Sequence, residues 1–400
     1  MIIIRNLLGI VILLGILYLV SNNKAYLNKK LIIRAFVLQF VVAFLLVKVP
    51  LGRVVIQKVS DVVSNVLNYG SEGLNFVFGS LSVGTAPTGM VFGIQVLGNI
   101  IFVSALVGAL FYLGVIGFVV KIIGGAIGKV IGTSKVESFV AVANMFLGQT
   151  ESPLLVSKYL PKMTESEILL VLISGMGSMS VSVIMGYVGL GIPMEYLLIG
   201  STLVPLGSII ISKILVPEVE VATGIDILKI DNKGDNENLI SAISEGASAG
   251  LNMALGIGAV LIAIVALVAM VNGFLGIFGV SVEGVLGYVF APIGYLMGVP
   301  NEQVLLAGQL LGSKMALNEF VAFGQLGKII STLDYRTGLM LSVSLAGFAN
   351  ISSMGICVSG ISVFCPEKRG QLSKLAFRGM IGGFCVSILS ALIVGLIIAI

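Results

Sequence analysis

Two glutamates stand at the centres of stretches that are otherwise apolar, Glu151 within residues 138–160 and Glu319 within residues 303–330. A charged side chain in the middle of a bilayer costs at least about 2.5 to 3.5 kcal/mol, so each glutamate predicts a polar cavity or a polar partner. A carboxylate in such a place can accept hydrogen bonds from a ligand or exchange a proton. The alternative is that both glutamates only fasten the fold, through a hydrogen bond or an ion pair between helices.

The composition sets the class of protein in which these glutamates act. The 400 residues are 57% hydrophobic and 10% charged, with a mean hydropathy of +1.12, whereas ordinary globular proteins have roughly 25% charged residues. Repeated apolar stretches of about 20 residues indicate an all-α polytopic membrane protein. The net charge of +4 is explained by basic residues that flank the spans, so no nucleic-acid partner is expected.

Several kinds of enzyme site are excluded by residue type. The chain has no histidine, which excludes Ser-His-Asp and Cys-His catalytic systems and histidine-ligated zinc. The three cysteines, Cys357, Cys365 and Cys385, are too few and too dispersed for a metal cluster or a disulfide framework, and we expect them to be inert. An intramembrane hydrolase that used both glutamates as acid and base would still lack a nucleophile.

Hydropathy predicts eight transmembrane helices. They cover residues 2–20, 31–47, 94–120, 168–190, 196–216, 251–271, 337–363 and 375–400. Residues 51–70 alternate valines and polar residues at helical spacing, which is typical of a helix at the membrane surface, and residues 122–131 predict a second, shorter interfacial helix. The two glutamate-containing stretches are predicted to be re-entrant helical hairpins.

The spans and hairpins predict a division of the chain. Residues 1–120 and 246–275 are expected to form mainly a scaffold, and residues 217–245 a hydrophilic cytoplasmic linker. Residues 121–216 and 276–400 form two repeats, each with an interfacial helix, a hairpin and two spans. If neither hairpin crosses the membrane, 16 of the 23 Lys and Arg residues lie in the cytoplasm when both termini are outside it. We therefore expect a protein of the cell (inner) membrane with both termini outside the cytoplasm.

The two repeats are predicted to have opposite orientations in the membrane. Glu151 and Glu319 lie 168 residues apart, and each is followed by a span rich in Gly and Ser. Three full spans separate the hairpins, and an odd number means that the hairpins enter from opposite faces. This inverted repeat is the plan of secondary transporters, whose substrate and ion sites lie near the bilayer midplane where broken helices meet.

The break in the first hairpin has a local cause. Pro153 lacks a backbone donor and disfavours helix at Ser152, so an unwound tip is expected at residues 148–153. Exposed carbonyls at such a tip suit a hard cation such as sodium, and amides suit a polar ligand. Asn350, an amide within the span after the second hairpin, is expected to contact the ligand rather than only a neighbouring helix.

Three runs of residues resemble motifs of the concentrative nucleoside transporter family. They are Asn144-Met-Phe-Leu-Gly-Gln-Thr-Glu-Ser-Pro153, Gly312-Ser-Lys-Met-Ala-Leu-Asn-Glu-Phe-Val-Ala322 and Gly347-Phe-Ala-Asn-Ile-Ser-Ser353. The resemblance covers nearly the whole chain, in the bacterial form with eight spans. It implies a homotrimer that imports nucleosides such as uridine by an elevator-type movement driven by a cation gradient, with no organic cofactor.

The resemblance also implies roles for individual residues. The first hairpin would bind the nucleobase through Gln149, Thr150 and Glu151, with Val183 as an apolar contact. The second hairpin and the following span would hold the ribose through Glu319, Asn350 and Ser353, with Phe348 close by. Sodium would be bound by Asn144, Leu147, Ser178 and Met179, and Asn144 in place of a serine favours sodium over protons.

Two alternatives to sodium symport stay open at this point. In a proton-coupled symporter Glu151 or Glu319 would titrate, and a pH gradient would drive uptake without sodium. A channel is less favoured, because two opposed hairpins around one polar centre suit alternating access better than a continuous pore.

Overall fold

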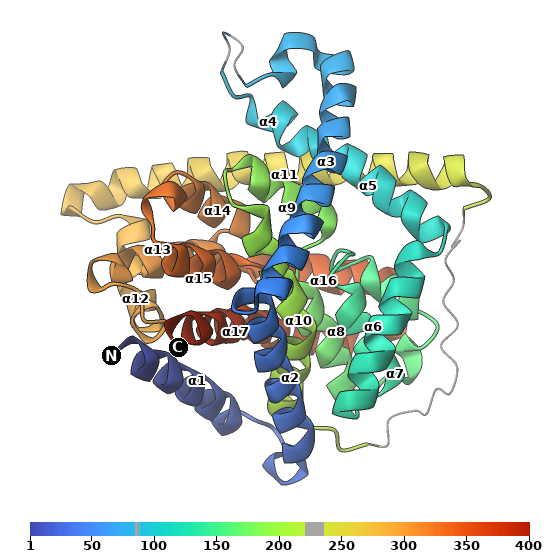
Figure 1. The fold of residues 1–400 in the computed structure, drawn as a ribbon, viewed down its shortest axis with the longest axis vertical. Coiled ribbons are helices and arrows are strands. Elements are labelled where there is room, and N and C mark those ends of the chain that lie inside the picture. The colour runs from blue at the N-terminus through green and yellow to red at the C-terminus, as the bar shows by residue number, and fades with distance from the viewer. Residues whose placement is uncertain (85–86, 88, 221–235) are drawn as a thin grey trace.

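The computed structural model describes residues 1–84, 87, 89–220 and 236–400, and it confirms the all-α prediction. Within these residues every regular element is a helix (Figure 1). Seven helical stretches are long and apolar enough to cross a membrane. The eighth predicted crossing, at residues 337–363, is divided into two helices that are each shorter than this.

The first two helices agree with the predicted spans, and the third is longer than expected. Helices α1 (Ile2–Leu19) and α2 (Lys29–Val47) are joined by a short loop, and the Asn28 side chain caps α2 by accepting a hydrogen bond from the Leu31 amide at 3.1 Å. The predicted surface helix at residues 51–70 is α3 (Pro50–Phe78), one end of which projects beyond the main body (Figure 1). A Cβ on Gly70 would lie 2.6 Å from the Asn99 side chain, so α3 also packs against the rest of the protein.

The predicted third span, residues 94–120, is wrong at its end. The short helix α4 (Phe92–Gln95) leads into α5 (Leu97–Tyr112), and α6 (Val115–Ile131) follows after a turn at Gly114, whose φ is +79°. A positive φ is easily adopted by glycine and ends the helix there. Residues 115–120 therefore belong to the same helix as the predicted interfacial segment 122–131.

The two hairpin segments are built differently. In the first, α7 (Lys135–Ala143) leads into turns and the short 3-10 helices η3 (Ser152–Val156) and η4 (Leu160–Lys162). The predicted unwound tip is present, although the helix already ends at Ala143. In the second, α12 (Val282–Leu296) precedes two α-helices, α13 (Val304–Ala316) and α14 (Glu319–Gly327), which are separated by Leu317 and Asn318.

The spans that follow the hairpins were predicted as continuous helices, and this prediction is wrong for both. Residues 168–190 form α8 (Glu165–Gly177) and α9 (Val181–Gly189), and residues 337–363 form α15 (Tyr335–Leu345) and α16 (Ile351–Phe364). The mean hydropathy stays high across both breaks, because most of the interrupting residues at 178–180 and 346–350 are small or apolar. Each repeat thus contains a hairpin segment, a broken helix and a continuous helix, in that order.

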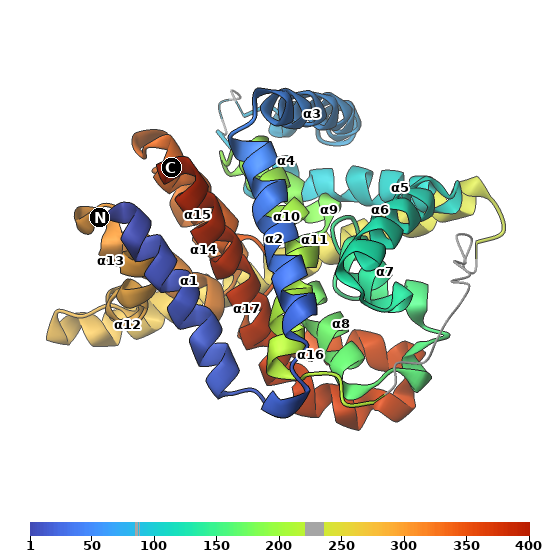
Figure 2. The ribbon, with the colours of Figure 1, turned by 60° about the horizontal axis from the view of Figure 1, so that its bottom comes forward.

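The continuous helices of the repeats lie at the centre of the molecule. Most residues of α10 (Met194–Leu215) and α17 (Arg369–Ala399) are buried, and the same is true of α8 and α15. Figures 1 and 2 show α10 and α17 surrounded by the other helices, with α7 and α12 to α14 toward opposite sides. The two repeats therefore share one densely packed body.

Helix α11 (Leu239–Leu275) corrects the predicted end of the hydrophilic linker. Asn238 caps it, so residues 239–245 are helical rather than part of a linker, while most of the linker prediction lies outside the described residues. The helix runs along one side of the molecule and packs closely on α5 (Figure 1). A Cβ on Gly246 or Gly250 would lie within 2.8 Å of α5, so these small residues allow the contact.

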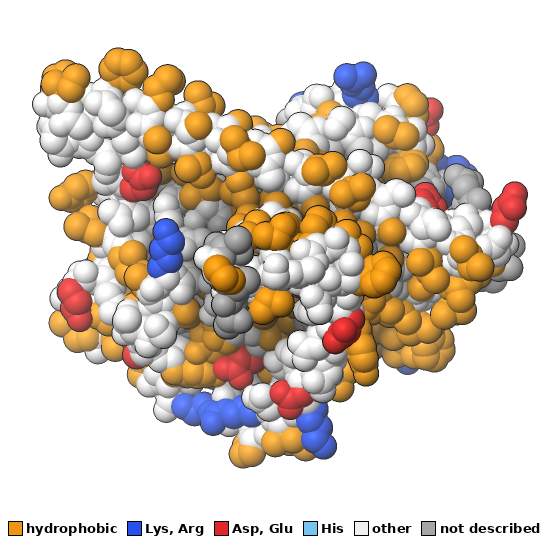
Figure 3. Space-filling model, turned by 90° about the horizontal axis from the view of Figure 1, so that it is seen from above, with side chains coloured by type: hydrophobic (Ala, Val, Ile, Leu, Met, Phe, Trp, Pro, Cys, Tyr) orange, Lys and Arg blue, Asp and Glu red, His pale blue; other side chains and the backbone are white. Residues whose placement is uncertain are grey.

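The outer surface is apolar over wide areas. Exposed residues of α11 include Leu251, Leu255, Ile262, Val265 and Phe274. Figure 3 shows one face on which hydrophobic side chains are spread widely and charged ones are few. Such a surface is stable against lipid or another apolar partner and would be unfavourable in water. The chain is therefore a multi-pass membrane protein.

Candidate functional site

The two helix breaks meet at the centre of the shared body. Gly347 has a φ of +106°, and a Cβ there would lie 2.5 Å from the Gly177 carbonyl oxygen, so only glycine fits without a shift. The Phe348 amide donates a hydrogen bond to the Ser178 carbonyl at 3.2 Å. The C-terminal ends of α8 and α15, which carry partial negative charge, are thus brought close together.

Glu319 is part of a buried polar group that joins the second hairpin to α16. Its side chain is 5% exposed. Its carboxylate accepts hydrogen bonds from the Asn350 side-chain amide at 2.8 Å and from the Tyr187 hydroxyl at 3.3 Å. Asn350 also caps α16, because its side-chain oxygen accepts from the Ser353 amide at 3.0 Å. Three of the predicted ribose contacts, Glu319, Asn350 and Ser353, are therefore held together at the start of one helix.

Phe348 lies two residues before this cap and is half-buried. The Asn350 backbone amide donates to the Phe348 carbonyl at 2.8 Å, which fixes the backbone between them. Phe348 therefore lies in the same helix break as the polar group.

Tyr187 was not foreseen from the sequence. Its ring lies on α9 with centroids 4.8 Å from Phe320 and 4.3 Å from Phe323, so aromatic packing directs its hydroxyl toward Glu319. Val183, the predicted apolar contact, lies one helical turn earlier on α9 and is buried. A tyrosine in an apolar span gives no sign in the sequence that it faces a carboxylate 132 residues away.

The tip of the first hairpin contacts the same helix, α16, farther along. The Cys357 thiol lies 3.2 Å from the Gln149 side-chain oxygen and donates a hydrogen bond to it. A Cβ on Gly360 would lie 2.4 Å from the Thr150 methyl group, so Thr150 packs directly against α16. Positions 350, 353, 357 and 360 share one helical face. This face connects the predicted base-binding residues with the predicted ribose-binding residues.

Three further polar groups lie at or near this tip. Cys357, which was expected to be inert, is a buried free cysteine, and its thiol contacts a candidate site residue. Glu151 accepts a hydrogen bond from the Gly148 amide at 3.0 Å, within its own tip, and no hydrogen bond between described residues joins it to the second hairpin. The Ser180 hydroxyl, just before α9, is buried and has no partner among the described residues, so it is available to a ligand.

The four predicted sodium ligands surround the end of α8. Asn144 ends α7, donates to the Ser174 hydroxyl at 3.0 Å and accepts from the Ser152 hydroxyl at 2.7 Å, so its amide ties the hairpin to α8. The carbonyls of Leu147 and Met179 accept no hydrogen bond from any described residue. Free carbonyls, an amide and a hydroxyl at the negative end of a helix fit a hard cation such as sodium.

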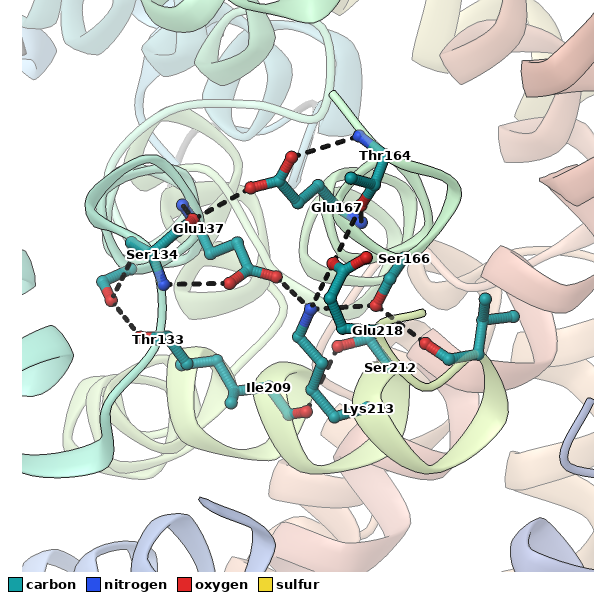
Figure 4. A network of polar contacts seen from close by, with 12 residues as sticks. Thr133, Ser134, Glu137, Thr164, Ser166, Glu167, Ile209, Ser212, Lys213 and Glu218 are labelled. Atoms are coloured by element: carbon teal, nitrogen blue, oxygen red, sulfur yellow. Dashed lines mark hydrogen bonds and ion pairs between the residues drawn. The ribbon is translucent and has the colours of Figure 1, made fainter. Parts of the chain in front are cut away.

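A largely buried charged cluster joins the starts of α7 and α8 to the end of α10 in the first repeat (Figure 4). Lys213 of α10 forms ion pairs with Glu137 of α7 and, at 3.4 Å, with Glu218, and donates to the Ser166 hydroxyl at 2.8 Å. Glu137 and Glu167 also close capping boxes at the starts of α7 and α8. The cluster holds two helix starts and one helix end together.

The opposite end of the molecule has a counterpart in which an arginine is hydrogen-bonded to neutral groups. The Arg336 guanidinium donates to the carbonyls of Met297, Gly298 and Gly395 and, at 2.7 Å, to the Asn6 side chain. The start of α1 and the end of α17 therefore lie side by side, and both termini are at the same end of the molecule (Figure 1).

Comparison with known proteins gives matches along the whole chain. Family models described as the N-terminus and C-terminus of Na+ dependent nucleoside transporters match residues 8–81 and 196–395, and one described as nucleoside recognition matches residues 93–194. The nucleoside permease NupC of Helicobacter pylori is 36% identical over 98% of this chain and 97% of its own length.

Solved structures of a transporter called CNTnw are similar over the full fold. Its inward-facing, substrate-bound state has a TM-score of 0.94 and 36% identity, covering 99% of each chain. An outward-facing state of a variant has a TM-score of 0.96 and 35% identity, covering 100% of this chain and 99% of the other.

Proposed function

The chain belongs to the concentrative nucleoside transporter family, and from this premise we propose that it imports nucleosides by sodium symport. The family is one of nucleoside transporters rather than enzymes, and its models describe Na+ dependence. The observation that supports the proposal most strongly is the helical face of α16, which brings the tips of both hairpin segments to one polar line.

In the proposed site the nucleoside lies along this face. The ribose hydroxyls donate hydrogen bonds to Glu319 and bond to Asn350 and Ser353, because a carboxylate is an acceptor and vicinal hydroxyls are donors. The base lies toward Gln149, Thr150 and Glu151, with Val183 and Phe348 as apolar contacts. Amide and hydroxyl groups of this kind can bond to the edges of several bases, which suits uridine and its relatives.

Sodium is assigned to the end of α8, where Asn144, Leu147, Ser178 and Met179 would hold it. When bound, the ion supplies positive charge to the negative end of that helix and fixes the first hairpin tip against the break. The neighbouring Gln149 lies on the same tip, so ordering the tip also places a base-binding side chain. This proximity gives sodium and nucleoside a common structural element through which their binding is coupled.

The proposed movement is of the elevator type and relates two bodies. Residues 121–216 and 276–400 form the moving repeats, and residues 1–120 and 246–275 mainly the scaffold, with a homotrimer formed through exposed apolar faces such as that of α11. We place eight crossings and two re-entrant hairpins in the cell (inner) membrane, with both termini outside the cytoplasm. The Lys213 end of the molecule would then face the cytoplasm, in agreement with the distribution of basic residues.

Uptake of labelled uridine into proteoliposomes tests the proposal. An inward sodium gradient is expected to drive accumulation, and replacing sodium with choline at constant pH is expected to abolish it. Uptake driven by a pH gradient without sodium would instead select proton coupling through Glu151 or Glu319. Unchanged uptake in choline without any ion gradient would contradict symport altogether.

The Asn144→Ala variant tests the sodium assignment. Loss of its amide is expected to raise the sodium concentration for half-maximal uptake by about 10-fold or more, since removing groups that orient ion ligands typically costs that much. Asn75→Ala is the matched control, because Asn75 is exposed on α3. Equal sodium dependence in the two variants would remove Asn144 from the ion site.

A further inference from the structure

Around the helix breaks, the sequences of the two repeats align with a constant difference in residue number. Four pairs of residues lie 170 positions apart: Asn144 and Lys314, Ser174 and Ser344, Gly177 and Gly347, and Ser180 and Asn350. In both repeats the second half-helix begins one residue after the last pair, at Val181 and Ile351. Lys314 therefore stands in the second repeat where the first has the sodium-site residue Asn144.

The surroundings of Lys314 are those of a bound cation. Its side chain is 0% exposed, and its ammonium donates to the carbonyls of Ser344 at 2.9 Å and Ala346 at 3.0 Å and to the Ser387 hydroxyl at 2.7 Å. These are three oxygen acceptors for three N–H donors, and the Phe384 ring lies 5.5 Å away. Among described residues no carboxylate lies within 4.0 Å of it.

The position of those oxygens explains how an ammonium is tolerated there. Helix α15 ends at Leu345, so the Ser344 and Ala346 carbonyls belong to its C-terminal end, which carries about half a negative charge. A buried charge is costly, and the helix end offsets part of that cost, together with the longer-range attraction of the Glu319 carboxylate. The end of α8 lies directly against this break, at the contact between Gly177 and Gly347, but has no basic side chain of its own.

We propose that the Lys314 ammonium is a tethered cation that stabilises the end of α15 in the second repeat, as bound sodium would stabilise the end of α8 in the first. The inference rests on the proposed sodium site. Two negative helix ends meet at the centre of the molecule, and a positive charge stabilises each of them. The protonated Lys314 supplies this charge to the end of α15 from within the chain, whereas sodium supplies it to the end of α8 only when it is bound. The two helix ends therefore take up one exchangeable ion per transport cycle.

The proposal makes Lys314 a positioning residue for the nucleoside site as well. Glu319 begins α14, five residues after Lys314, and Asn350 follows Ala346 in the same break. Lys314 fixes the end of α15 whether or not sodium is bound, so Glu319 and Asn350 on the ribose side of the site stay in place. The base side, at the first hairpin tip, is ordered only when sodium binds. A lysine that served only in packing would have no relation to sodium.

Two substitutions separate these possibilities. Lys314→Asn gives the second repeat the residue of the first, and Lys314→Met keeps the apolar stem but supplies neither charge nor ligand. In purified Lys314→Asn we expect the ratio of sodium to uridine taken up to rise from about one to about two, and the Hill coefficient for sodium to rise toward two. Lys314→Arg, which retains the charge, should keep the wild-type ratio.

Stability measurements keep the test informative if a variant transports poorly. The thermal unfolding midpoint of each detergent-purified variant is measured in sodium chloride and in choline chloride. Sodium should raise the unfolding midpoint of Lys314→Asn more than that of the wild type. It should give no such additional increase for Lys314→Met. Equal ratios and equal sodium responses in all variants would overturn the proposal. Sodium-independent uptake by the wild type would instead reject the proposed coupling and leave the variant comparison interpretable through stability.

Discussion

The first and second repeats have the same order of parts but hold charge differently. At the central break the first repeat has neutral groups, Asn144 and free carbonyls, whereas the second has the buried ammonium of Lys314. At the outer ends the arrangement is reversed, since the first repeat has a cluster of carboxylates around Lys213 and the second has Arg336 bonded to neutral groups. The two repeats therefore share the order of their helices and breaks but not the placement of their charges.

The difference in secondary structure follows the difference in charge. The second hairpin consists of two regular helices, α13 and α14, and its Lys314 is saturated with hydrogen bonds. The first hairpin has only one α-helix and a tip of turns with unbonded carbonyls. We infer that the regular half is preorganised for the ribose, while the irregular half is completed by its ligands.

The largest effect is expected from Lys213→Met, compared with Arg336→Met. Removing Lys213 leaves Glu137 buried without its cation, and breaking a buried pair in this way costs about 3 to 5 kcal/mol. Arg336→Met leaves only neutral acceptors unbonded, which costs less for each group. Thermal unfolding in detergent should show a clearly lower midpoint for Lys213→Met, and Glu137→Gln in the same chain should restore part of it. A larger loss in Arg336→Met would reverse the comparison of the two ends.

A somewhat smaller effect is expected for Glu319→Gln, compared with Glu151→Gln. Glu319 accepts two hydrogen bonds from buried donors, one at each carboxylate oxygen. In a glutamine one of these oxygens is replaced by an NH₂ group, which cannot accept the hydrogen bond from its donor. Hydrogen bonds to charged groups contribute about 1.5 to 3 kcal/mol, so uridine affinity should fall about 10- to 100-fold. Competition uptake with uridine and its deoxy analogues measures this. If Glu319→Gln kept the preference for ribonucleosides, ribose recognition would not depend on Glu319. If Glu151→Gln lost that preference equally, ribose recognition would not be specific to the second hairpin.

The sequence singled out candidate site residues where local chemistry is distinctive. Pro153 indicated a break in the first hairpin, although α7 already ends at Ala143, and Glu319 and Asn350 stood out because polar groups are scarce in apolar spans. The breaks within residues 168–190 and 337–363 were missed, since they depend on contact between Gly177 and Gly347 rather than on a loss of hydropathy. The sequence also did not predict that Tyr187 contacts Glu319 or that Lys213 contacts Glu137. Both contacts depend on how distant helices pack against each other.

The smallest effect is expected for Cys357→Ala, which tests whether α16 joins the two halves of the site. The thiol is a weak donor, and its loss leaves the Gln149 oxygen without that contact, so uridine affinity should change about threefold, within the usual range for one neutral hydrogen bond. Competition among different nucleosides should show an altered order of base preference, while the preference for ribonucleosides over deoxy analogues stays constant. Cys365→Ala is the control, because Cys365 lies beyond the end of α16. The opposite result, an altered ribose preference with an unchanged base preference, would contradict this placement. The ribose would then lie at the first hairpin and the base at the second, with α16 still contacting both.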